Sequence, residues 1–265
     1  MNNHQICPPG FLNNSNNILG IEYLKALRKI NSKIKPCTIN RFNNKYNCNE
    51  ITDGISSATS IRNSILEDKN IDLIKNVVPS STFNLLKEEL RINKGPVFTE
   101  DFAQVIISII RKISLEELRD IFDVNEGLEH RIKTASIKAS SIKELISLIK
   151  SKRYTQTRIQ RILYHALIGI NKEIYSNLRT NYGPQYIRVL GFNENGQKLL
   201  NIAKQKTSLP IITKVADFKN IDNSLFNKIL EYEITATNIY TLGYKNLDYK
   251  VGNLDYTHNI EIIKS

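Results

Sequence analysis

Beyond residue 79, apolar side chains recur at the spacing of an α-helix, and hydroxyl side chains precede several of the runs. Thr99 precedes one apolar face, which consists of Phe102, Val105, Ile106, Ile109, Ile110 and Ile113. An apolar residue at every third or fourth position predicts a helix that buries one face. The pairs Ser114 with Glu117 and Ser141 with Glu144 are typical of capping boxes, which satisfy free backbone amides at a helix start. This part of the chain is therefore expected to fold as a series of packed helices.

The same pattern continues to the end of the chain, with a small mixed region after residue 183. Thr157 precedes a longer helix with a core stripe of Ile159, Ile162, Leu163, Ala166, Leu167 and Ile170. The later elements expected are short strands at Tyr186–Leu190 and Leu209–Val215, and helices at Glu194–Lys204 and Ser224–Ile234. The pattern predicts a helical domain over residues 79–265 with a small α/β tail.

The first 78 residues form a fragmentary strand-and-helix region. A helix is expected at Ile18–Ile30, capped by Asn16 or Asn17, with an apolar face of Ile18, Tyr23, Leu24 and Leu27. An edge strand is expected at Ile34–Ile39, which contains Pro36. A polar loop precedes Ile55–Arg62, where we expect a turn that leads into a helix. The fold class expected for the whole chain is α/β plus α.

Composition narrows the class of protein. The chain has 265 residues, of which 41% are hydrophobic, so it can bury a real core. Three cysteines without paired spacing argue against a disulfide framework or a zinc knuckle, and we expect thiols in a reducing cytoplasm. No apolar run approaches the roughly 20 residues that a membrane span needs. We predict no metal site and no catalytic residue from the residues alone.

The net charge of +11 points to an acidic partner, and the position of the charge matters more than its size. The stretch Arg131–Arg161 has one acid, Glu144, and nine cations: Arg131, Lys133, Lys138, Lys143, Lys150, Lys152, Arg153, Arg158 and Arg161. Arginine and lysine contacts to phosphate dominate nucleic-acid affinity, and Tyr154 could stack on an unpaired base. RNA is therefore the favoured partner, although a merely solvated basic face would show the same composition.

Two segments of the first 78 residues suit a bound anion. Ser57 lies at an expected helix start, where free backbone amides and the helix dipole favour negative charge. Arg62 in the first turn can donate two hydrogen bonds to one phosphate. Arg41 follows the expected strand, where α/β folds bind nucleotides. On local grounds alone, an ordinary helix cap and surface arginines explain these residues equally well.

These pieces together resemble one family, the bacterial tRNA(Met) cytidine acetate ligases, which are nucleotidyltransferase-like enzymes. The matching stretches are Asn16–Gly20, Lys35–Arg41, Ile55–Arg62, Glu126–Ile132, Lys152–Thr155, Thr157–Arg161 and Tyr186–Gly191. They follow the family's order from near residue 13 to near residue 240.

The resemblance implies a fold and a reaction. Residues 1–78 would be the rear part of a Rossmann-like, ATP-binding nucleotidyltransferase domain, and residues 79–265 a helical tRNA-binding domain. The family activates acetate with ATP as acetyl-adenylate and transfers the acetyl group to the wobble cytidine of elongator tRNA(Met). ATP, as a substrate together with Mg²⁺, and acetate and tRNA are the implied partners.

The resemblance also assigns residues by motif. The ATP contacts it implies are Asn16, Arg41, Phe42, Ser57 and Arg62. The resemblance gives tRNA to the helical domain as a whole, in agreement with the charge argument, and the tRNA contacts that we predict there are Arg131, Lys152, Arg153, Tyr154, Arg158 and Arg161.

The 265 residues depart from the family at one functionally important point. The segment with the family's pair of phosphate-stabilising histidines is not among them. One hypothesis is therefore a partial ligase with little activity of its own. The alternative is a stand-alone, non-catalytic RNA-binding module. A DNA-binding helical protein is a weaker interpretation because no compact helix-turn-helix pattern is present.

Overall fold

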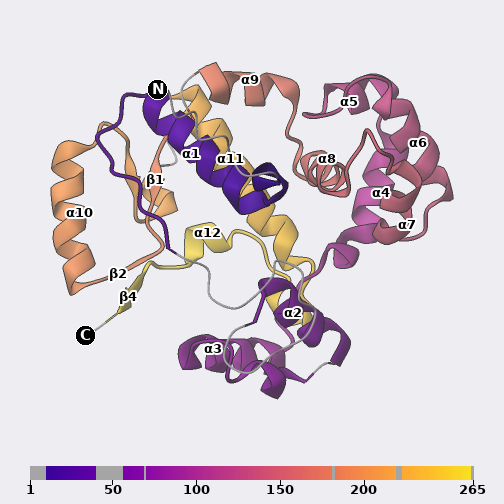
Figure 1. The fold of residues 1–265 in the computed structure, drawn as a ribbon. Coiled ribbons are helices and arrows are strands. Elements are labelled where there is room, and N and C mark those ends of the chain that lie inside the picture. The colour runs from indigo at the N-terminus through magenta and orange to yellow at the C-terminus, as the bar shows by residue number, and fades with distance from the viewer. Residues whose placement is uncertain (1–9, 40–55, 69, 181–182, 219–222, 264–265) are drawn as a thin grey trace. The chain divides into compact units, whose positions relative to one another are not determined.

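The computed structural model describes residues 10–39, 56–68, 70–180, 183–218 and 223–263 (Figure 1). The chain divides into two compact units, residues 1–83 and 84–265. The described residues are mostly helical with few strands, as the sequence pattern indicates. No described helix is long and apolar enough to cross a membrane.

The described part of the first unit is a set of short helices. Its elements are η1 (Phe11–Asn13), α1 (Ser15–Lys29), α2 (Ala58–Asn63), the π-helical turn η2 (Ser64–Asp68) and η3 (Ile71–Ile74). Helix α3 (Ser80–Arg91) begins in this unit, and the boundary falls inside it. Ile74 and Phe83 are its buried apolar side chains among the described residues.

Three expectations for this unit are wrong in detail. The cap of α1 is Asn14, which accepts a hydrogen bond from the Asn16 backbone amide, and not Asn16 or Asn17. None of the residues of α1 is buried, so the face expected to enter a core is uncovered among the described residues. The segment 34–39 is not a strand, since no described strand pairs with it and Pro36 lacks a ladder donor.

The second unit is built around one large helical core. Its first elements are η4 (Thr99–Phe102), α4 (Ala103–Lys112), α5 (Leu115–Asp120), α6 (Leu128–Lys138), α7 (Ile142–Ile149), α8 (Gln156–Ile168) and α9 (Lys172–Thr180). The apolar stripes predicted for α4, α7 and α8 supply many of its fully buried side chains, among them Ile106, Ile110, Leu145, Ile159 and Leu163, while Leu118, Leu128 and Ile132 come from α5 and α6. Periodicity therefore identified a large part of this core.

The helix starts follow the predicted chemistry with small shifts. Ser114 and Glu117 form the expected capping box. Ser141 caps α7, but the Glu144 carboxylate turns to the backbone and hydroxyl of Ser140 instead of completing a box. Helix α8 is capped by Thr155 and begins at Gln156, two residues before the predicted start.

The tail of the second unit contains the described strands. Its elements are β1 (Ile187–Arg188), β2 (Gly191–Asn193), α10 (Glu194–Lys206), β3 (Ile211–Ile212), η5 (Val215–Phe218), α11 (Ser224–Thr241), η6 (Leu247–Tyr249), α12 (Leu254–Thr257) and β4 (Glu261–Ile263). Strand β1 pairs in parallel with β3, and β2 in parallel with β4. A second core consists of Ile212 of β3, Val215 of η5, and Phe226, Leu230 and Ile234 of α11. The expected small α/β tail is thus present, with β2 and β4 as strands that the sequence did not suggest.

Several cations of the helical core cap the carboxyl ends of helices. Lys133 donates to the last carbonyls of α4, and Arg111 donates to those of α6. Arg131 donates to the carbonyls of Leu148 and Lys150 at the end of α7. Cations are stabilising at these ends because the helix dipole and the free carbonyls are both negative there. A basic residue in this unit is therefore not automatically a free surface charge.

Candidate nucleic-acid interface

The loop between α5 and α6, residues 122–127, brings acidic groups onto the basic stretch; we call it the acidic loop. Three of its residues have left-handed backbone angles: Asp123 at φ 74°, Glu126 at 59° and Gly127 at 80°. A non-glycine residue in a sparsely populated region costs about 1–3 kcal/mol and persists only where its surroundings hold it. Here arginine side chains hold the acidic loop in this conformation.

Three arginines of the basic stretch bind this loop. Arg161 forms an ion pair with the Asp123 carboxylate at 2.8 Å. Arg158 donates to the Asp123 carbonyl at 2.8 Å and to the Asn125 side chain. Arg153 pairs with the Glu126 carboxylate. Glu144 is the one acidic residue in the sequence of residues 131–161, but the fold places two more carboxylates, those of Asp123 and Glu126, against the arginines of this stretch.

Tyr154 lies inside this arrangement and not on the surface. Its side chain is 8% exposed, and its hydroxyl donates to the Glu126 carbonyl at 3.4 Å. The guanidinium carbons of Arg153 and Arg158 lie 5.9 and 5.5 Å from the ring centroid, within cation–π range. The expectation that Tyr154 stacks on a base does not fit this burial, because the ring would have to leave the core.

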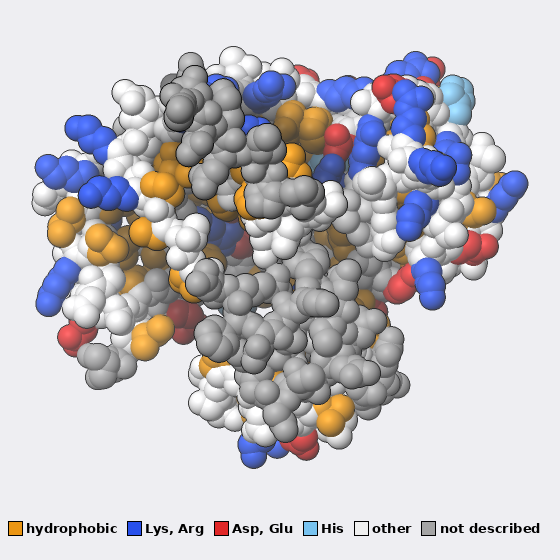
Figure 2. Space-filling model, viewed as in Figure 1, with side chains coloured by type: hydrophobic (Ala, Val, Ile, Leu, Met, Phe, Trp, Pro, Cys, Tyr) orange, Lys and Arg blue, Asp and Glu red, His pale blue; other side chains and the backbone are white. Residues whose placement is uncertain are grey.

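Apart from Lys133, which caps α4, the lysines of the stretch are its available charges. Lys143, Lys150 and Lys152 are exposed, and their side chains have no ion pair or hydrogen bond among the residues that the structure describes. Lys138 at the end of α6 shares this property. Figure 2 shows blue side chains gathered over the region of α5, α6 and α7, with another group over α10. These lysines can contact phosphates without breaking a side-chain hydrogen bond or ion pair of the described residues.

Glu129, the first acidic residue of α6, is buried and has a structural role. Its carboxylate accepts from Arg119 at 3.0 Å, while its second oxygen has no partner among the described residues. Its own backbone amide and the Arg119 guanidinium hold the pKa of Glu129 below its ordinary value of 4.5, against the opposing effect of burial. His130 beside it is exposed, and its Nε2 lies 3.9 Å from the Glu129 carboxylate.

The candidate ATP contacts lie in the first unit, and the structure describes three of the five. Asn16 is exposed in the first turn of α1. Ser57 caps α2 by accepting from the Ser60 amide at 3.0 Å, and Arg62 is exposed in the last turn of α2. The hydroxyl of Ser56 is buried without a hydrogen-bond partner among the described residues. Arg41 and Phe42 lie outside the described residues.

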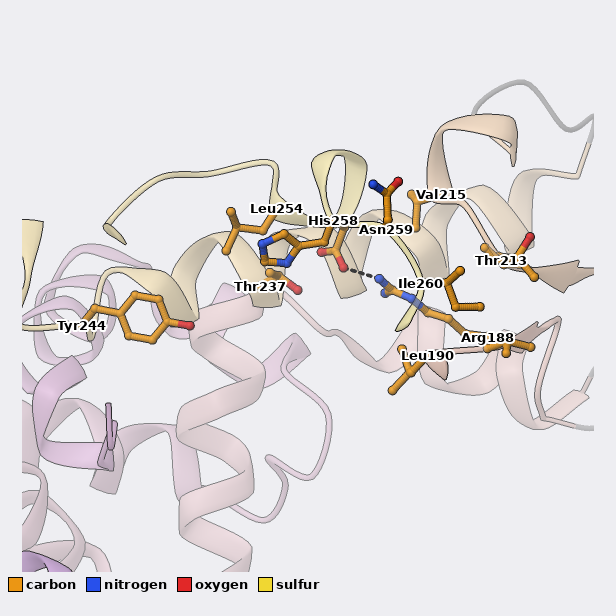
Figure 3. Close-up of a pocket in the computed structure, with 13 residues that line it drawn as sticks. Arg188, Leu190, Thr213, Val215, Thr237, Tyr244, Leu254, His258, Asn259 and Ile260 are labelled. Carbon is orange, nitrogen blue, oxygen red and sulfur yellow. Dashed lines mark hydrogen bonds and ion pairs between the residues drawn. The ribbon is translucent and has the colours of Figure 1, made fainter. Parts of the chain in front are cut away.

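Sequence reasoning missed a cavity in the tail of the second unit. It has a volume of about 270 Å³ and lies at the ends of β1 and β3 (Figure 3). Arg188, Asp255 and His258 line it, and Arg188 pairs with Asp255 across 67 positions of sequence. The one sequence signal was the stretch Tyr186–Gly191, which carries the family resemblance but whose chemistry was not assigned.

Comparison with known proteins places the chain in a family. The family model described as HIGH Nucleotidyl Transferase matches residues 2–255. The chain belongs to the HIGH nucleotidyl transferase family. No group of three or more His, Cys, Asp or Glu side chains that could hold a metal ion occurs among the described residues of this family member.

Curated relatives in this nucleotidyl transferase family include tRNA(Met) cytidine acetate ligases. That of Acetivibrio thermocellus is 43% identical over 98% of this chain and 63% of its own length. That of Caldanaerobacter subterraneus subsp. tengcongensis is 46% identical over 94% of this chain and 60% of its own length. The chain thus spans about three fifths of the length of these relatives.

Solved structures agree with the family assignment. Apo Thermotoga maritima TmcAL superposes with a TM-score of 0.90 at 30% identity, covering 96% of this chain and 62% of that one. The form bound with alpha-thio ATP gives a TM-score of 0.86, covering 96% and 60%. The resemblance that the sequence motifs indicated is therefore confirmed at the level of family and fold.

Proposed function

We propose that this chain works in an ATP-dependent ligase that acetylates the wobble cytidine of elongator tRNA(Met) through acetyl-adenylate, and that residues 84–265 bind the tRNA. The observation that carries the proposal is a set of exposed lysines, Lys143, Lys150 and Lys152, without side-chain partners among the described residues. They lie on a chain whose relatives are named tRNA(Met) cytidine acetate ligases. Cytoplasmic localisation follows from this proposed role, because the tRNA is there.

The structure changes which side chains of the basic stretch are the best candidates. Arg131 caps a helix, and Arg153, Arg158 and Arg161 hold the acidic loop. An exposed ion pair is worth only about 0–1 kcal/mol, so Arg153 and Arg161, each about 60% exposed, can exchange a carboxylate for a phosphate at little cost. The lysines need no exchange, and we therefore assign them the primary phosphate contacts.

In this proposal, the first unit binds ATP. Its support is the nucleotidyl transferase family and the alpha-thio ATP bound by the Thermotoga maritima relative. Ser57 and Arg62 lie at opposite ends of α2. The Ser56 hydroxyl, which has no hydrogen-bond partner within the described part of the chain, is a group that a polar ligand could satisfy. The finer assignment, a Rossmann-like ATP site formed with Asn16, Arg41 and Phe42, is part of the proposal. Mg²⁺ would enter with the ATP phosphates, its usual protein-site partners.

The comparisons favour the ligase over the stand-alone RNA-binding module. Relatives that match nearly the whole chain at 43% and 46% identity are both named as ligases. Both interpretations share the prediction that residues 84–265 bind RNA, which makes RNA binding the first property to test.

The test replaces the three free lysines with glutamine and measures tRNA retention on a filter at about 0.1 M salt. The triple variant K143Q/K150Q/K152Q is expected to bind tRNA at least tenfold more weakly, because fewer lysine–phosphate pairs release fewer counterions on binding. The matched control is K198Q/K204Q/K206Q on α10, which removes the same charge from exposed lysines of the same unit. Equal weakening in both triple variants would show a general charge effect and contradict the assigned interface.

A further inference from the structure

Three aromatic rings lie together at the start of the acidic loop; we call them the aromatic stack. The rings of Phe122, the first residue of the loop, and Tyr175 of α9 are stacked, with centroids 3.5 Å apart and planes 19° apart. The imidazole ring of His165 on α8 lies 5.5 Å from the Phe122 ring. Tyr175 is 42% exposed, and Phe122 and His165 are partly buried, so the stack lies at the surface of the second unit.

Hydrogen bonds hold the aromatic stack in place. Ile121, directly after α5, forms an isolated antiparallel bridge with Asn171, which lies between α8 and α9 (Figure 1). The Phe122 amide donates to the Ile170 carbonyl at 3.5 Å, and the His165 Nδ1 lies 3.3 Å from the Phe122 carbonyl. Side chains that are already fixed lose little conformational entropy when they bind a partner, so the rings are preorganised.

Cations border Tyr175 on α9. Lys172 lies three positions before Tyr175 and Arg179 four positions after it, and residues at these spacings share one side of a helix. The one acid of α9, Glu173, is on another side of the helix, where it and Asn177 line a separate pocket. The exposed ring therefore has basic and not acidic neighbours along its own helix.

The aromatic stack is continuous with the basic stretch. Arg161 pairs at 2.8 Å with Asp123, the residue after Phe122 in the acidic loop. Asp120 and Asp123 are the acidic neighbours of Phe122 in the sequence, and Arg161 and the two cations of α9 outnumber them. Arg179 has no side-chain partner among the residues that the structure describes. The surface around the stack therefore favours an anionic partner.

An exposed aromatic ring bordered by cations is suited to an unpaired RNA base. The base stacks on the ring, while the cations contact the phosphates on either side of it. A protein partner would need a wider apolar surface. Tyr175, however, is the only large apolar side chain that is exposed within residues 149–180, a range that the structure describes in full.

We propose that Tyr175 binds an unpaired base of the bound RNA by stacking, with Lys172, Arg179 and Arg161 contacting the neighbouring phosphates. The proposal rests on the proposed RNA-binding function and deepens it, since it names a single-stranded segment as the form of RNA bound here. Tyr175 takes the role that the sequence suggested for Tyr154, whose ring is buried.

The first test uses the absence of tryptophan from the sequence. In Tyr175→Trp the indole is the sole tryptophan and keeps an aromatic face for stacking. Oligoadenylate and tRNA are expected to quench its emission saturably, because a stacked base quenches an indole. Heparin, a polyanion without bases, should bind the same cations without saturable quenching. Absence of quenching by oligoadenylate, or equal quenching by heparin, would overturn the proposal.

Tyr240→Trp is the matched control for this test. Tyr240 is also exposed, at 47%, and its ring lies 5.7 Å from that of Tyr244 in a second aromatic pair of the same unit. Acids lie near this pair: burial raises the pKa of Tyr240, and the negative charges of Glu89 and Asp101 raise it further. Oligoadenylate should therefore leave the emission of Tyr240→Trp unchanged, and equal quenching in both variants would contradict a specific site at Tyr175.

The second test separates stacking from charge. Tyr175→Leu removes the ring and should weaken tRNA retention at least about fivefold. The slope of log affinity against log salt should stay unchanged in this variant because no cation is lost, whereas Arg179→Gln should reduce that slope by about 0.7. Tyr175→Phe keeps the ring and should bind like wild type, since the Tyr175 hydroxyl has no hydrogen bond among the described residues.

Two results of the second test would overturn the proposal. One is wild-type retention of tRNA by Tyr175→Leu. The other is a reduced salt slope in Tyr175→Leu, because the ring would then act only by holding cations in place. If Tyr175→Leu does not fold, as seen by circular dichroism, the quenching of Tyr175→Trp decides.

The outcome is separable from that of the proposed function. Retention of tRNA by the wild-type chain without quenching in Tyr175→Trp would overturn the stacking site alone. Quenching by oligoadenylate without retention of tRNA would overturn the tRNA-binding function and leave a site for single-stranded RNA. Absence of both would overturn both.

Discussion

At the scale of single residues, the chain uses the same residue types for structure and for partners. Arg131 and Lys133 look like RNA contacts in the sequence, but both donate to carbonyls at helix ends. Lys150 and Lys152 look the same in the sequence and have no such contact among the described residues. Local composition cannot separate the two cases because the carbonyls come from distant helices.

Glu129 gives a pH-dependent prediction at this scale. Because the pKa of Glu129 is lowered in the folded state, its contribution to stability is complete above its ordinary value of 4.5 and is lost as the pH falls through the folded pKa. Glu129→Gln should therefore reduce the free energy of unfolding by about 1–2 kcal/mol at pH 7. This is the size expected for the loss of a charge-assisted hydrogen bond to Arg119, which is half-exposed. Urea unfolding at pH 7 and pH 3 measures this. A difference between variant and wild type that stays constant down to pH 3 would exclude the assigned role.

At the scale of elements, the helices with a periodic apolar face were predictable from the sequence, but the contacts of the loops between helices were not. The stripes of α4, α7 and α8 were predictable because a 3.6-residue period is a local property. The acidic loop was not, since Asp123 meets Arg161 across 38 positions. The same holds for the cavity and for Tyr154, whose burial depends on how α8 packs against that loop.

The acidic loop allows the structural and RNA-binding roles of Arg161 to be separated. Asp123→Asn removes the ion pair, keeps a residue that tolerates the left-handed conformation, and leaves Arg161 free. Arg161→Gln breaks the same pair and removes the cation. Both should lower the free energy of unfolding by up to about 1 kcal/mol. Only Arg161→Gln should weaken tRNA binding, measured by filter retention; equal weakening in both variants would mean that Arg161 acts only by holding the loop.

At the scale of the whole molecule, the two units were predictable to different degrees. The helical unit has a complete core of its own, so its pattern could be read directly from the sequence. The first unit was read through family motifs, and its expected strand and its buried helix face were wrong among the described residues. Family membership is established for nearly the whole chain, over residues 2–255, whereas the roles of the two units remain proposals.

The most direct test of the central claim is a crosslinking map of tRNA on the intact 265-residue chain. Photo-crosslinking to thiouridine-substituted tRNA, followed by mass spectrometry of the peptides, identifies the residues that lie against RNA. We predict that crosslinks concentrate in residues 138–161, around Lys143, Lys150 and Lys152. Crosslinks confined to α10 or to the first unit, with none in residues 131–161, would contradict it.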